Sequence, residues 1–282
     1  GGSAFAAIAI FLWLSTWFHG YVPPAQPMAP LLWHVHEMVY GFAAAIIIGF
    51  LFTAARNWTG LPLPAGTPLA FLFGLWLAAR LGMYFAYDAA AAILDSSLLI
   101  IVAAVLSRSF IRARSYKNMP MALVLIFLAT ANIAFHAAML GYATLDPMLP
   151  LRAALFLVIM MELIIGSRIV PGFTISGVPG IKIRRSKPLN YTTQALAALA
   201  FITFVAGAPA PIAGPLAILA GLLGLIQLAG WKPWAARSRP ILLILHISYA
   251  WIPVGLIMLG LASFGVWGVT VSAAIHALAA GS

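Results

Sequence analysis

Ten long apolar stretches constrain the fold of this chain more than any other feature. Each is close to the roughly 20 residues that an α-helix needs to cross a bilayer. Only 7% of the 282 residues are charged and 64% are hydrophobic, whereas a soluble domain averages about a quarter charged residues. We therefore predict an all-α, polytopic transmembrane helix bundle. The expected spans are residues 1–18, 35–54, 66–87, 89–107, 119–143, 150–174, 191–208, 211–230, 240–262 and 264–281.

The chain reads as one transmembrane helical domain over residues 1–282, and both of its ends look cut. Gly1 leads almost directly into apolar sequence, without a basic flank or a signal-peptide pattern. Ser282 closes an apolar helix without a polar anchor. We expect a fragment that lacks sequence at both ends.

Basic residues gather in the loops that follow even-numbered spans. Most of the 15 lysines and arginines lie in residues 108–117, 182–187 and 232–239. By the positive-inside rule these loops are cytoplasmic, and so is the N-terminus. The net charge of +10 is then explained by membrane orientation, and we expect a lipid bilayer around the chain rather than a nucleic-acid partner.

Histidines near the predicted outer surface are the first candidate site. His34 and His36 open the second span, and His136 lies in the fifth, with Asn132 one turn deeper on the same face. Imidazole ligates haem iron and copper. Positions i and i+2 point to nearly opposite sides of a helix, so His34 and His36 are not expected to hold one ion together. Interfacial anchoring for His34 and His36, or structural hydrogen bonding for His136, is the alternative.

A second set of polar residues lies lower in the predicted bundle. Arg168 is in the sixth span, His246 in the ninth and His276 in the tenth. Arginine at this depth is permanently charged and needs an anion or several carbonyls. A haem propionate would suit it, and so would a structural carboxylate. The chain has no cysteine, which excludes thiolate metal sites and a thiol nucleophile.

Five short stretches resemble the NnrS family of bacterial membrane proteins. They occur in the family's order over nearly the whole chain. The resemblance implies a multi-pass protein of the bacterial inner membrane, with about twelve helices when complete. It also implies haem and copper, and a part in the response to nitric oxide and in nitrogen-oxide metabolism. The stretches are Trp33–Met38 with Gly41 and Phe42, Asn57–Gly60, Asn132–His136, Gly166–Thr174 and Ser272–Leu278.

Three functions from different classes stay open at this point. The first is a haem- and copper-binding protein, with cofactor ligands among His34, His36, His136, Arg168, His246 and His276 and a metal site at the first three. It would handle nitric oxide or a nitric-oxide–metal adduct, and catalytic turnover is left open. The second is a transporter, or a proton or metal pathway, that uses buried His, Glu and Arg. The third is a structural or assembly partner of respiratory proteins.

Overall fold

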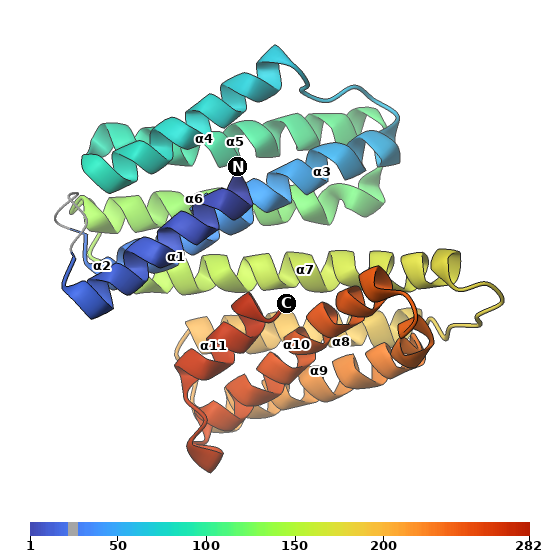
Figure 1. Ribbon diagram of the computed structural model, residues 1–282. Coiled ribbons are helices and arrows are strands. Elements are labelled where there is room, and N and C mark those ends of the chain that lie inside the picture. The colour runs from blue at the N-terminus through green and yellow to red at the C-terminus, as the bar shows by residue number, and fades with distance from the viewer. Residues whose placement is uncertain (22–27) are drawn as a thin grey trace. The chain divides into compact units, whose positions relative to one another are not determined.

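Helices joined by short connections make up the computed structural model, which describes residues 1–21 and 28–282 (Figure 1). Within these ranges the regular elements are all helical. The longer elements are α1 (Gly2–His19), α2 (Pro30–His36), the π-helix η1 (Glu37–Ala43), α3 (Ala44–Thr59), α4 (Thr67–Phe85), α5 (Ala89–Arg112), α6 (Met119–Met139), α7 (Met148–Gly177), α8 (Lys187–Val205), α9 (Ala210–Gly230), α10 (Pro240–Ser263) and α11 (Val271–Ala280).

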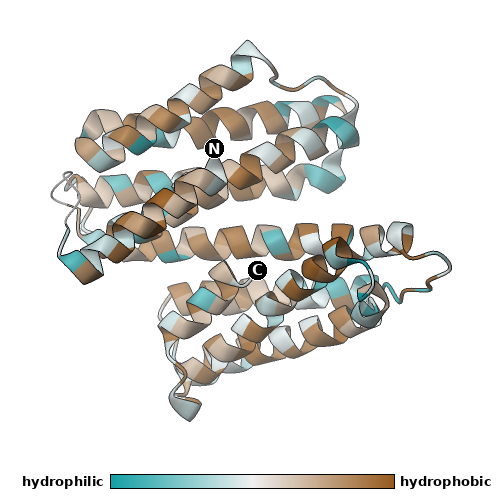
Figure 2. Cartoon of the chain, viewed as in Figure 1, coloured by the Kyte–Doolittle hydropathy of each residue, from teal (hydrophilic) through white to brown (hydrophobic). Residues whose placement is uncertain are grey.

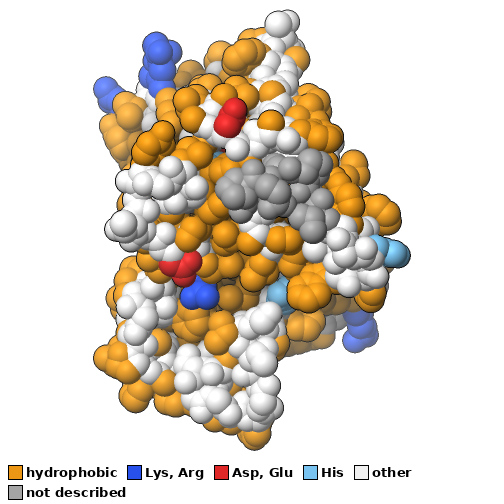
Figure 3. Space-filling model, turned by 90° about the vertical axis from the view of Figure 1, so that its left-hand side faces the viewer, with side chains coloured by type: hydrophobic (Ala, Val, Ile, Leu, Met, Phe, Trp, Pro, Cys, Tyr) orange, Lys and Arg blue, Asp and Glu red, His pale blue; other side chains and the backbone are white. Residues whose placement is uncertain are grey.

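Eight helical segments of the described residues are long and apolar enough to cross a membrane. They include α2, η1 and α3 as one continuous segment, Pro30–Thr59. Apolar residues dominate the helices along their length (Figure 2), and hydrophobic side chains spread over much of the face in Figure 3. The polytopic all-α prediction is confirmed.

Two of the ten predicted spans differ from the expectation. Residues 264–281 were expected to form one span, but α11 has only 10 residues, or about 15 Å of helix. Gly265, Trp267 and Gly268 interrupt the chain before it, each with positive φ. Helix α8 has 19 residues but is not among the eight membrane-length apolar segments, since polar residues such as Asn190 and Gln194 occupy its first turns.

Helix boundaries follow the local chemistry of the chain. Pro30 and Pro240 open α2 and α10, where the missing backbone N–H costs little. The side chain of Asp88 caps α5 by accepting a hydrogen bond from the Ala91 amide at 2.9 Å. Gly60 ends α3 with φ of 69°, a conformation that glycine adopts without a steric penalty. These caps set where each helix enters the bundle.

The chain divides into two compact units, Gly1–Val158 and Ile159–Ser282, with the boundary inside α7. In the first unit α5 packs against both α4 and α6. In the second unit α9 packs against α8 and α10, and α10 also packs against α11. Helices α9 and α10 approach closely at Gly221, where an added Cβ would lie 2.6 Å from the Pro253 carbonyl oxygen. Small residues allow this closeness in membrane helices.

Candidate metal centre

Six polar side chains meet in the interior of the first unit, and we call them the polar cluster. Each is at most 4% exposed. They come from four parts of the chain that α5 and its neighbours bring together: the α2–η1 junction, α4, α5 and α6. Ionisable groups inside a membrane bundle are costly and mark functional sites by default. The members are His36, Glu37, Arg80, Asp95, Asn132 and His136.

Arg80 joins the two carboxylates of the polar cluster. Its NH1 group donates to Glu37 Oε1 at 2.7 Å, and its NH2 group pairs with Asp95 Oδ1. The guanidinium stays charged and presents several donors in a fixed plane. One cation therefore bridges two anions that sit on different helices and holds η1, α4 and α5 in register.

Both ring nitrogens of His36 face hydrogen-bond acceptors. Nδ1 lies 3.0 Å from Glu37 Oε1, and an ionised carboxylate only accepts, so Nδ1 carries a hydrogen. Nε2 lies 3.1 Å from Asn132 Oδ1 and 3.2 Å from Asp95 Oδ2. Asn132 cannot turn a donor toward His36, because its Nδ2 already donates to Asp95 Oδ2 at 2.7 Å. Nε2 of a neutral His36 thus directs a lone pair at two acceptors, an arrangement that calls for a positive charge between them.

His136 is held by partners on both sides of its ring. Nε2 lies 3.1 Å from Asp95 Oδ2, and Nδ1 lies 3.1 Å from the Tyr87 hydroxyl. Burial raises the pKa of Tyr87, which lies just outside the membrane-spanning segments, so its hydroxyl keeps its proton. The contact with Tyr87 fixes the orientation of the imidazole from the connection between α4 and α5.

Three metal-ligating groups converge at the centre of the polar cluster. One ligand atom each from His36, Asp95 and His136 lies within 4.8 Å of the others. Two imidazoles and one carboxylate suit Cu, Zn or non-haem Fe. The ring of His36 packs against Tyr40 and Phe135 at centroid distances of 4.9 and 4.8 Å. A bare ion is small enough to lie between three ligand atoms that are this close together.

The π-helix η1 shapes the backbone beside the polar cluster. The Ala44 amide bonds to the Val39 carbonyl, five residues earlier, and such π-bulges are frequent at functional sites. The indole nitrogen of Trp76 donates to the Gly41 carbonyl at 3.0 Å. A Cβ on Gly41 would lie 2.9 Å from Glu37 Oε2, so glycine leaves room there for the carboxylate that bonds His36.

His34 lies outside the polar cluster. Its ring stacks on Trp13 of α1, with centroids 4.4 Å apart and planes 14° from parallel. His36, two residues on, points into the bundle, as the i, i+2 spacing predicts. The structure thus brings His36 and His136 together and places His34 in an aromatic contact instead.

The second set of predicted site residues is dispersed over the second unit. His246 is 2% exposed, and its Nε2 lies 2.9 Å from Thr174 Oγ1. Thr174 donates its own hydrogen to the Val170 carbonyl, so His246 Nε2 is the donor and Nδ1 carries the lone pair. Arg168 is exposed on α7, and His276 is exposed on α11 with Nδ1 2.7 Å from the Ser272 carbonyl.

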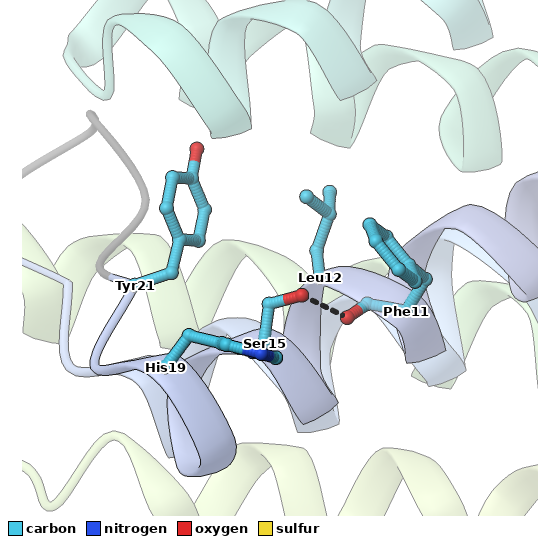
Figure 4. A pocket seen from close by; sticks show the side chains of 5 residues that line it. All are labelled: Phe11, Leu12, Ser15, His19 and Tyr21. Atoms are coloured by element: carbon cyan, nitrogen blue, oxygen red, sulfur yellow. Dashed lines mark hydrogen bonds between the residues drawn. The ribbon is translucent and has the colours of Figure 1, made fainter.

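A separate open recess of about 420 Å³ lies along α1 and the turn after it (Figure 4). Its lining includes no member of the polar cluster. Ser15 bonds to the Phe11 carbonyl at 2.8 Å within it, which is an ordinary intrahelical contact. The lining residues are Phe11, Leu12, Ser15, His19 and Tyr21.

Sequence reasoning did not identify Arg80, Asp95 or Tyr87 as parts of the site. A signal was present for two of them, because Arg80 and Asp95 are ionisable residues inside predicted apolar spans. Tyr87 carried no such signal, since tyrosine is common at membrane interfaces.

Comparison with known proteins places the chain in a family. The family model described as "NnrS protein" matches residues 1–282, the whole chain. No curated protein and no solved structure matches it. The five stretches that resemble NnrS and the membrane helix bundle agree with this match. The chain belongs to the NnrS family.

Proposed function

We propose that this NnrS-family chain is a membrane metalloprotein that binds a copper ion through His36, Asp95 and His136. The observation that carries the proposal is the convergence of three ligand atoms within 4.8 Å in a buried cluster. Each imidazole also has a partner on its other nitrogen, Glu37 for His36 and Tyr87 for His136. Such outer partners orient the rings of metal-bound histidines. Glu37 also fixes the tautomer of His36, whereas the Tyr87 hydroxyl can either donate to His136 or accept from it.

Each residue has a distinct task in this site. Glu37 keeps the hydrogen of His36 on Nδ1 and leaves Nε2 free to ligate. Asn132 and Arg80 bond to opposite oxygens of Asp95 and hold its carboxylate in place. A copper ion held by these residues would supply a centre to which a small molecule such as nitric oxide could bind.

The family implies haem as well as copper. The polar cluster is better suited to bind a copper ion than a haem group. We assign the proposed porphyrin to the second unit, which holds His246, Arg168 and His276. His246 favours this assignment most, because its Nδ1 lone pair has no hydrogen-bond partner among the described residues. The proposed role is in the response to nitric oxide in the bacterial inner membrane, with respiratory proteins as partners.

Metal analysis of single variants tests the copper site. His36→Ala, His136→Ala and Asp95→Asn should each lower copper per chain in protein that inserts and purifies as the parent does. His34→Ala is the matched control, since His34 stacks on Trp13 outside the polar cluster, and it should keep full copper content. Equal copper in all four variants would exclude the site. A visible spectrum of each sample, with His246→Ala beside them, reports haem independently.

A pathway for protons or metal ions is the second candidate. It is favoured by one observation, the buried network of Glu37, Arg80 and Asp95 within membrane-length helices. Connected series of buried ionisable side chains line proton and ion pathways in transporters. Ion uptake into vesicles containing the purified chain separates it from a fixed metal site, because a fixed site binds without transport.

A further inference from the structure

The polar cluster contains two negatively charged carboxylates and only one positively charged side chain. Glu37 and Asp95 are both paired with the single guanidinium of Arg80. Arginine remains protonated in proteins, and its two contacts favour ionised carboxylates. With neutral imidazoles, the cluster keeps one uncompensated negative charge in the membrane interior, where net charge is costly.

The hydrogen bonds of His36 also indicate that the cluster needs one more positive charge. Its Nδ1 hydrogen is used by Glu37, and Nε2 faces Asn132 Oδ1 and Asp95 Oδ2. Both of these atoms are acceptors. One positive charge at Nε2 would satisfy the contact and neutralise the cluster at once. A single proton supplies it, and so does a single monovalent metal ion bound between His36 and His136.

We propose that Arg80 is the selectivity residue of this site and restricts it to a monovalent ion, cuprous copper, over divalent ions such as zinc. The inference rests on the proposed function, that the polar cluster binds a metal. Imidazole suits copper, and two Nε2 atoms that face one centre can hold it. A divalent ion would leave the buried cluster with a net positive charge beside the Arg80 guanidinium. Arg80 thus acts through charge and through the position of Asp95, without ligating the ion.

Charge variants at two positions test this directly. Arg80→Gln makes the cluster more negative by one charge, and Glu37→Gln makes it less negative by one, while the amide oxygen of glutamine can still accept from His36 Nδ1. Because the Coulomb energy scales with ion charge, the ratio of Cu(I) to Zn(II) affinity should fall in Arg80→Gln and rise in Glu37→Gln. We expect changes on the order of ten- to a hundredfold. The double variant restores the parent charge and should restore the parent ratio.

The measurement uses the full chain purified in detergent, titrated with Cu(I) against a chromophoric cuprous chelator and with Zn(II) against a zinc indicator. Equal ratios in the parent, both single variants and the double variant would overturn the inference. A parent that prefers zinc would overturn it as well. A parent that binds neither ion would instead refute the proposed function. If Arg80→Gln does not fold, Glu37→Gln and the double variant still test the inference. A lower ratio of Cu(I) to Zn(II) affinity in Glu37→Gln would contradict the charge argument. A ratio in the double variant that differs from that of the parent would contradict it too.

Discussion

Removing the shared cation of the polar cluster should destabilise the first unit more than removing one of its anions. Arg80→Met leaves Glu37 and Asp95 buried and uncompensated, for which we expect a loss of about 3–5 kcal/mol in the free energy of unfolding. Asp95→Asn leaves Arg80 paired one-to-one with Glu37 and keeps the side-chain volume. Its expected cost is about 1–3 kcal/mol, typical of altered buried hydrogen bonds.

Hydrogen exchange of the detergent-purified chain can measure this difference locally. Amides of α4, α5 and α6 should exchange fastest in Arg80→Met, at an intermediate rate in Asp95→Asn and slowest in the parent. Amides of α8–α10 serve as an internal reference, because the second unit holds no member of the polar cluster. Ile100→Ala is the control on α5, since Ile100 is 48% exposed, and should change stability by no more than about 0.5 kcal/mol. If Asp95→Asn matched or exceeded Arg80→Met, the charge count of the cluster would be wrong.

Three further outcomes are expected. Trp76→Phe removes the indole donor to the π-helix carbonyl and should cost about 1 kcal/mol, seen as faster exchange in η1 and as lower copper content. Thr174→Val leaves the His246 Nε2–H group without its acceptor and should destabilise the second unit by about 1–3 kcal/mol, whereas Thr174→Ser should not; thermal unfolding compares the two. Reporter fusions after Lys117 should read as cytoplasmic and those near Asp146 as external, and the reverse readings would reject the positive-inside assignment.

The helices were predictable from sequence because the bilayer imposes a simple rule on length and apolarity. Eight segments of the described residues meet that rule. Residues 264–281, one of the two exceptions, show where the rule fails: hydropathy averages over a stretch, while Gly265 and Gly268 break the helix locally with positive φ. Helix-breaking backbone conformations before α11, rather than apolarity, limit the length of this helix.

The candidate site was predictable only in part. Helical depth placed His36 and His136 in one layer, and the structure brings their ring centroids within 5.5 Å. Depth cannot show which helices are neighbours, so the contacts of Asp95 with both histidines could not be derived from spacing. The π-helix η1 could not be predicted either, because hydropathy and helical spacing carry no signal for i to i+5 bonding.

The energetics of the polar cluster argue that it exists for function rather than for stability. The chain has only five acidic residues, and Glu37 and Asp95 both lie in this one cluster. Well-packed apolar residues in place of a buried ion network are often neutral or stabilising, and apolar residues are abundant in this chain. A network that gains little stability, contains two histidines and leaves one Nε2 facing acceptors is best explained by a cation that it binds. The cation is either held as a fixed metal ion or passed along a pathway. Uptake and metal-content measurements on the same variants distinguish these two functions.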